Sequence, residues 1–329
     1  MAEYINIKGQ NIEVVSSDPA NPTIGQIWYN STSNTLKGGG VTTAGAWATA
    51  NNMNTARRAL TGAGIQTAAL AFGGYTNPPL ATGNAVATEE YDGNSWTNSN
   101  PLNTARRALR GVGIQTAALG FGGYTYPATI TGVTEEYDGN SWTTSNPLNT
   151  ARSLLGGAGT QTAGLAFGGS IPPNTAATEE YNGTSWATSP GSMSTARQAL
   201  GGAGTQTAAL AFGGGPPVTG ATEEYNGTSW ANSNNMNTAR QDIAGAGIQT
   251  AALGFGGYST AITGATELYD GTSWTSNPTG LNTARYDGLA GAGTQTAGLA
   301  FGGSIPPNTA ATEEWTGAGA PTTVTITAS

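Results

Sequence analysis

The chain has 329 residues, of which only 9% are charged and 51 are glycine, and its formal net charge is −8. Lysine occurs only at Lys8 and Lys37, so the positive charge that nucleic-acid binding requires is almost absent and no nucleic-acid partner is expected. Cysteine and histidine are both missing, which excludes disulfides, thiol chemistry and imidazole metal ligands. No apolar run reaches membrane-spanning length and residues 1–10 lack a signal-peptide pattern, so we expect neither membrane insertion nor a cleaved leader.

Residues 1–40 precede the repetitive part of the chain and form a predicted segment of their own. Residues 25–30 and 35–37 are expected to pair as a hairpin around the turn at 31–34, and residues 11–15 alternate weakly between polar and apolar. We interpret this segment as an N-terminal β-hairpin that attaches to another part of the molecule or to a partner.

From residue 41 to 315, one pattern of residues recurs six times. Each copy begins with Thr-Ala-Arg and continues through a small-residue stretch, Phe-Gly-Gly and Thr-Glu, to an aromatic residue. The copies follow one another at intervals of 43 to 49 residues. A period of this length predicts a repeat architecture in which each copy is one supersecondary unit.

The hydrophobic period within a copy is that of short strands. In the first copy we expect strands at 60–65, 68–72, 87–91 and from residue 95 onward, with Gly73 and Gly74 ending the second and Asp92 and Gly93 forming the last turn. Glycine and threonine interrupt every possible helix. Four short antiparallel strands per copy predict an all-β protein made of β-propeller blades.

The number of copies and the closure follow from counting landmarks. Phe-Gly-Gly and the third-strand aromatic residue each occur six times, but a fourth-strand Trp follows only five of the copies. The missing one is Trp47, which lies ahead of the first copy. We therefore predict a six-bladed propeller closed by an N-terminal outer strand around Trp47 that completes the last blade, which removes the free edge of an open array. Residues 316–329 form a predicted C-terminal strand that either pairs with the N-terminal segment or extends the last blade.

Two charged positions are present in every copy and are interpreted as a repeated, partly buried ion pair, perhaps bidentate. A catalytic role for these carboxylates is the alternative, since paired acids hydrolyse glycosides, but a catalytic site is expected once and this feature occurs six times. A second acid follows the first except in the fifth copy, which has Leu268, so that position is interpreted as not requiring charge. The predicted pairs are Arg57 with Glu89, Arg106 with Glu135, Arg152 with Glu179, Arg197 with Glu223, Arg240 with Glu267 and Arg285 with Glu313.

The aromatic residues are periodic too, which favours packing between adjacent blades over the stacking of sugars. Specific recognition is instead expected where the copies differ, in the connections between second and third strands. These connections place scattered aromatic and proline residues on one face, suited to a glycan or a protein. Drift of these loops without function is the alternative. The candidate binding residues are Tyr75, Pro78, Pro79, Tyr124, Tyr126 and Tyr258.

The order of landmarks resembles the kelch repeat, with Phe121, Gly122 and Gly123 followed by Tyr137, then Trp142, then an Arg that opens the next copy. The resemblance covers residues 45–315 and departs at Trp315, where a Tyr is expected. It implies a kelch-like β-propeller. The absence of His and Cys separates the chain from kelch propellers that bind copper, and no enzymatic activity, cofactor or metal is expected.

The phrase DPANPTIGQIWYNSTSNTLKGG resembles N-terminal pieces of structural proteins from tailed bacteriophages, particularly marine ones. This resemblance implies a virion-associated tail or fibre module that is assembled in the host cytoplasm and contacts other virion proteins. Its loop face would bind a host surface glycan or protein. A cellular kelch scaffold that mediates protein–protein interaction is the alternative. The oligomeric state is not indicated, since no coiled-coil heptad is present.

Overall fold

The computed structural model describes residues 12–20, 22–23, 25–42, 44–76, 83–319 and 321–326. All regular structure in these residues is β, and the strands assemble mostly into four-stranded antiparallel sheets. The described residues contain no helix that could cross a membrane. The chain divides into two compact units, residues 46–316 and residues 1–45 together with 317–329.

The smaller unit is one sheet in the order β1-β2-β3-β30. Strands β2 (Ile27–Asn30) and β3 (Thr35–Val41) form the expected antiparallel hairpin, while β1 (Glu13–Val15) lies parallel to β2. Strand β30 (Pro321–Thr325) pairs with β3, so the C-terminal strand joins the N-terminal segment. The Asp18 carboxylate accepts hydrogen bonds from the side chains of Asn30 and Trp28, which hold its pKa below the usual value.

In the described part of residues 46–316, six sheets have four antiparallel strands each, and the strands follow chain order in the first five sheets. We call them the first to sixth repeat sheets. Their first strands are β5 (Thr61–Ile65), β9 (Arg110–Ile114), β15 (Gly156–Gly159), β19 (Gly201–Gly204), β23 (Ala244–Ile248) and β27 (Ala290–Gly293). Their second strands are β6 (Ala68–Phe72), β10 (Ala117–Phe121), β16 (Gly164–Phe167), β20 (Ala209–Phe212), β24 (Ala251–Phe255) and β28 (Ala297–Phe301).

The third strands carry the Thr-Glu motif and the fourth strands begin at the repeated Trp. The third strands are β7 (Thr88–Tyr91), β13 (Thr134–Tyr137), β17 (Thr178–Tyr181), β21 (Thr222–Tyr225), β25 (Thr266–Tyr269) and β29 (Thr312–Thr316). The fourth strands of the first five sheets are β8 (Trp96–Ser99), β14 (Trp142–Ser145), β18 (Trp186–Thr188), β22 (Trp230–Ser233) and β26 (Trp274–Ser276). A small hairpin of β11 (Tyr124–Thr125) and β12 (Thr129–Ile130) lies in the connection between the second and third strands of the second repeat.

The sixth repeat sheet takes its fourth strand from the other end of the chain. Strand β4 (Ala46–Ala50) pairs antiparallel with β29, and Trp47 lies directly opposite Trp315. The ring of Trp47 packs against Phe255 at a centroid distance of 4.8 Å, and its indole N–H donates to the Thr266 hydroxyl. The N-terminal strand therefore contacts both the sixth and the fifth repeat sheets.

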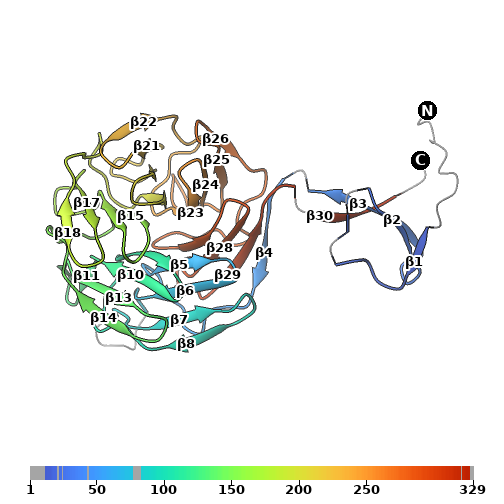
Figure 1. Cartoon of the computed structure of the whole chain (residues 1–329), viewed down its shortest axis with the longest axis horizontal. Helices are drawn as coiled ribbons and strands as arrows, with labels where there is room; N and C mark the ends of the chain where they lie inside the picture. The colour runs from blue at the N-terminus through green and yellow to red at the C-terminus, as the bar shows by residue number, and fades with distance from the viewer. Residues whose placement is uncertain are drawn as a thin grey trace. The chain divides into compact units, whose positions relative to one another are not determined.

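The core lies between neighbouring sheets because the second strands are buried on both faces. Leu70 and Phe72 face the second repeat sheet, where Phe72 meets Trp142 at 4.7 Å, and the alanines of the same strand face the sixth repeat sheet. Large side chains on one face and small ones on the other let successive sheets pack closely. Figure 1 shows these sheets around a common centre, an arrangement consistent with a propeller-like repeat fold.

The Phe-Gly-Gly motif marks the close approach of each sheet to the connection that follows. Gly73 has a φ of +64°, and a Cβ there would lie 2.8 Å from Leu109 Cδ2 and 2.9 Å from the Arg106 carbonyl oxygen. Only glycine satisfies both the left-handed backbone and the lack of space.

Candidate functional site

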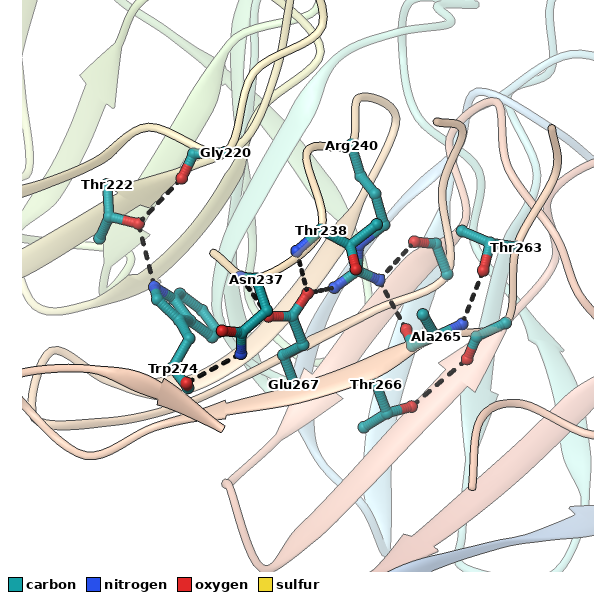
Figure 2. A network of polar contacts seen from close by, with 12 residues as sticks. Gly220, Thr222, Asn237, Thr238, Arg240, Thr263, Ala265, Thr266, Glu267 and Trp274 are labelled. Atoms are coloured by element: carbon teal, nitrogen blue, oxygen red, sulfur yellow. Dashed lines mark hydrogen bonds and ion pairs between the residues drawn. The ribbon is translucent and has the colours of Figure 1, made fainter. Parts of the chain in front are cut away.

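The repeated Arg and Glu form a buried network, shown for the fifth repeat in Figure 2. The Arg240 guanidinium donates from Nη2 to Glu267 Oε1 at 2.8 Å and from Nη1 to the carbonyl oxygens of Gly256 and Ala265. Glu267 Oε2 accepts the backbone N–H of Asn237 at 2.7 Å, and the Asn237 amide donates to the Trp274 carbonyl. The pair thus ties the incoming connection to the second, third and fourth strands.

All six pairs have N–O distances of 2.5 to 2.9 Å, and their side chains are at most 2% exposed. They are therefore fully buried, not partly buried as the sequence suggested. The predicted bidentate geometry is also absent, since in all but one pair the second terminal nitrogen donates to backbone carbonyls; the exception, Arg197, reaches Glu223 through Nη1. Burial lowers the pKa of Arg240, and the charge of Glu267 opposes that shift.

The second acid, at a position interpreted from the sequence as not requiring charge, binds the next repeat. The Tyr137 hydroxyl donates to Glu90 of the preceding sheet, and burial together with this bond raises the pKa of Tyr137 to about 12. Each such bond joins two neighbouring repeat sheets, and we call the contact between two such sheets a seam. The pairs are Tyr91 with Glu314, Tyr137 with Glu90, Tyr181 with Glu136, Tyr225 with Glu180 and Tyr269 with Glu224.

The two departures from the repeat pattern meet at the remaining seam. Leu268 stands where the other copies have the second Glu, and it packs in the same apolar cluster as Trp315, which stands where the others have Tyr. The Trp315 indole N–H donates instead to the Gln295 carbonyl at 2.8 Å. A hydroxyl–carboxylate contact is therefore replaced by an apolar one, and the two changes compensate each other across the interface.

Sequence analysis missed a repeated glutamine in the turn between first and second strands. The Gln161 amide donates to the carbonyl oxygens of Ala118 and Tyr137 in the preceding sheet. The Gln66 amide reaches Gly298 and Trp315 in the same way, so the first repeat sheet is joined to the sixth. The signal was present as a Gln-Thr pair at the same place in every copy. The glutamines are Gln66, Gln115, Gln161, Gln206, Gln249 and Gln295.

The candidate loop-face residues do not gather at one point. Tyr75 lies between Arg58 and Arg107, whose guanidinium carbons are 5.1 and 5.2 Å from its ring centroid, and Arg107 is also 5.6 Å from the ring of Tyr124. These four residues form what we call the Arg–Tyr stack. Tyr258 pairs separately with Tyr286, while Tyr126 is 58% exposed. Pro78 and Pro79 lie outside the described residues.

The Arg–Tyr stack belongs to positions that change from copy to copy. The residue after the repeated Arg forms a β-bridge with the residue after Phe-Gly-Gly, as between Arg58 and Tyr75 or Arg107 and Tyr124. The equivalent bridges in the other repeats join Ser153 to Ser170, Gln198 to Gly215, Gln241 to Tyr258 and Tyr286 to Ser304. The first two repeats thus carry the same Arg–Tyr pair at this bridge, whereas the other four carry different pairs, of which Ser153, Ser170, Gly215 and Ser304 are buried.

Inside these bridges lies a ring of six residues that precede the first strands, which we call the mouth residues. Although none is glycine, all have φ between 49° and 54°, a strained conformation for an L-residue. In five of the six, the backbone N–H donates to the carbonyl oxygen of the mouth residue in the preceding repeat. For Ala59 of the first repeat, that residue is Asp287 of the sixth. The mouth residues are Ala59, Ala108, Leu154, Ala199, Asp242 and Asp287.

Below the mouth residues, the first strands enclose a cavity of about 200 Å³. Its lining is mainly glycine and alanine, and among the described residues Arg110 and Asp242 are its charged members. Burial, and secondarily the charge of Asp287, raise the pKa of Asp242 to about 7. Asp287 forms an ion pair with Arg58 at 3.0 Å. Within the described part of the chain, no group of three or more carboxylates is arranged to hold a metal ion.

No protein-family model matches this chain, and the comparison with curated proteins found no match.

Proposed function

We propose that residues 46–316 form a six-bladed, kelch-like β-propeller whose last blade is completed by β4. Three observations support this. The first strand of each repeat sheet lies next to the first strand of the following one, and β27 lies next to β5. Gln66, Trp96 and Tyr91 bind the sixth repeat sheet as their equivalents bind other preceding sheets. The mouth residues continue the same circle through the bond from Ala59 to Asp287.

The propeller serves as a non-catalytic binding module. The observation that carries this proposal is that repeated positions and variable positions have different roles. Residues that occur in every copy are used inside the protein, where Arg, Glu, Gln and Trp hold strands or neighbouring sheets together. Residues that differ between copies form the bridges around the mouth, and eight of these twelve, among them Arg58, Tyr75 and Arg107, remain partly accessible. A surface that varies on a uniform scaffold is typical of recognition.

The partner we favour is a glycan or protein of a host cell surface, bound at the loop face. The Arg–Tyr stack places guanidinium groups over aromatic rings, a combination suited to polar ligands that carry hydrogen-bond acceptors beside apolar patches. In this proposal the chain is part of a phage tail or fibre, and the smaller unit attaches it to other virion proteins. The phage resemblance of residues 18–39 is the support for that placement.

Binding of the fluorescently labelled full chain to a glycan array and to intact host cells tests the proposal. Replacing Tyr75 and Tyr124 by Ala should reduce binding by at least about tenfold, since each removes an aromatic contact surface. Ile114→Ser is the matched control, because Ile114 is 54% exposed at the turn between first and second strands, at the opposite end of the sheet. Equal binding by all variants would refute the loop-face proposal.

The placement in a virion has its own test. Mass spectrometry of purified virions from the source phage should detect the polypeptide. Its absence from virions, together with capture of one intracellular protein by the loop face, would support the cellular kelch scaffold instead.

A further inference from the structure

One position of the cavity lining is charged in a single repeat. Arg110 opens the first strand of the second repeat sheet, opposite Phe121. Because the register opposite the repeated Phe is the same in all six sheets, the equivalent residues can be identified directly. They are small and uncharged: Thr61, Gly156, Gly201, Ala244 and Ala290. Packing therefore does not require an arginine at this position.

The Arg110 guanidinium is only partly compensated by the protein. Its Nη2 donates to the carbonyl oxygens of Gly202 at 3.2 Å and Gly157 at 3.4 Å, both long contacts, and its Nε is buried with no acceptor. In contrast to the six repeated arginines, it forms no ion pair with any carboxylate in the described part of the chain. Desolvation lowers the pKa of Arg110 to about 10. Arg110 is half-buried, so its charge is only partly exposed to water, and an anion beside it would offset the cost of that desolvation.

The surroundings restrict the kind of anion. The lining is mainly glycine and alanine and exposes backbone polar groups beside aliphatic side chains such as Val112 and Ile243, which suits a small ligand that has both polar and apolar groups. Asp242 also lines the cavity and Asp287 lies beside it, so a second negative charge on the ligand would be repelled. A planar carboxylate matches the fork of a guanidinium, which can donate two parallel hydrogen bonds to it.

We infer that the cavity inside the ring of first strands binds a small monocarboxylate, with Arg110 as the residue that holds the carboxylate group. This site lies within the cavity, whereas the proposed glycan or protein contact uses the loop face outside it. The inference therefore goes beyond the proposed function and does not depend on its ligand.

Isothermal titration calorimetry of the full chain with acetate, propionate and butyrate tests the inference, with propionamide as the neutral probe. The wild type should bind propionate saturably and propionamide at least about tenfold more weakly, since the amide lacks the charge that the guanidinium binds. Arg110→Gln should lose at least about tenfold in propionate affinity. Arg107→Gln, which removes an adjacent arginine of the loop face, should keep the affinity of the wild type.

Three results would overturn the inference. They are the absence of saturable propionate binding by the wild type, equal affinity of Arg110→Gln, and tighter binding of inorganic phosphate than of propionate. Thermal unfolding without ligand shows whether the variant has a folding defect. Arg110→Gln should melt no lower than the wild type, because it removes a half-buried charge that has no carboxylate partner among the described residues. Glycan or host-cell binding by the same variant should stay unchanged, which separates this site from the loop face.

Discussion

The buried Arg–Glu pairs bind backbone groups in several parts of one repeat. In the fifth repeat, Arg240 and Glu267 together satisfy two backbone carbonyls and the N–H of Asn237. Glu267 accepts the backbone N–H of Asn237 in the connection between the fourth and fifth repeats, whereas Arg240 binds carbonyls at the two ends of the connection between the second and third strands of its own sheet. The pair thus satisfies backbone groups outside the strands at both connections.

Glu267→Gln tests this role. The substitution keeps the shape of the side chain but leaves the buried Arg240 without its counter-charge, so we expect a loss of about 3–5 kcal/mol in the free energy of unfolding. Urea denaturation measures the change. Glu13→Gln, at an exposed position of β1, should stay within about 0.5 kcal/mol of the wild type. Equal stability of both variants would contradict the role.

The exchange at Leu268 and Trp315 makes a second prediction at this scale. Leu268→Glu alone places a carboxylate beside an indole, and Trp315→Tyr alone leaves a hydroxyl without a carboxylate partner, so both should destabilise. The double variant recreates the Tyr–Glu bond of the other seams and should be more stable than the sum of the single changes predicts, with a coupling energy of about 0.5–3 kcal/mol. A double-mutant cycle by urea denaturation measures that energy. Additive effects would show that the two positions are independent.

At the scale of the strand, β4 completes a sheet whose other three strands lie at the far end of the repeat unit in the chain. Trp47 is 6% exposed, packs against Phe255 and Trp315, and accepts a bond from the Asn282 amide at its carbonyl. Without β4 the third strand of the sixth repeat sheet would have an open edge.

Two truncations isolate the contribution of β4. Deleting residues 1–50 removes it, whereas deleting residues 1–44 keeps it and removes only strands of the smaller unit. The longer deletion should lower the Tm by more than about 5 °C relative to the shorter one, since loss of a buried Trp alone costs about 3–5 kcal/mol. Differential scanning calorimetry compares them. The same Tm for both would mean that β4 contributes nothing to the stability of the repeats.

At the scale of the whole repeat unit, the proposed closure predicts that all seams are equivalent. Gln66 and Gln161 make the same two hydrogen bonds to a preceding sheet, one at the junction of the chain ends and one in the middle of the chain. Gln66→Ala and Gln161→Ala should therefore destabilise to a similar extent, about 1–3 kcal/mol each by urea denaturation. In an open array Gln66→Ala would have little effect, because its partners would lie at a free end.

The seams also predict how stability changes with pH. Burial and the neighbouring carboxylates raise the pKa of Tyr137, Tyr181, Tyr225 and Tyr269 to about 12, compared with about 10 in an unfolded chain. Between these values the unfolded state releases protons that the folded state retains, so stability should fall as pH rises above about 10. Tyrosinate absorbance from these phenols should appear together with the loss of near-ultraviolet circular dichroism. Ionisation of all tyrosines before unfolding would contradict this.

Much of the repeat unit was predictable because the chain repeats its pattern six times. The order of strands and the Arg–Glu pairs recur with small changes, and comparing copies separates what a repeat needs from what it tolerates. The same comparison did not reveal the role of the position that Leu268 occupies, because the partner of that position lies in the next repeat. The glutamines were missed for that reason as well.

The sequence alone determined the local content of each repeat, because alternation along a strand and the turns at Gly and Asp depend on near neighbours. Only the tertiary structure decided which residues meet between repeats. The pairing of Leu268 with Trp315, the full burial of the ion pairs and the placement of Arg110 in a cavity depend on side chains far apart in the sequence. Whether a charge has a partner is settled by those neighbours, and this is why Arg110, which is half-buried and has no carboxylate partner among the described residues, differs from the six fully buried and paired arginines.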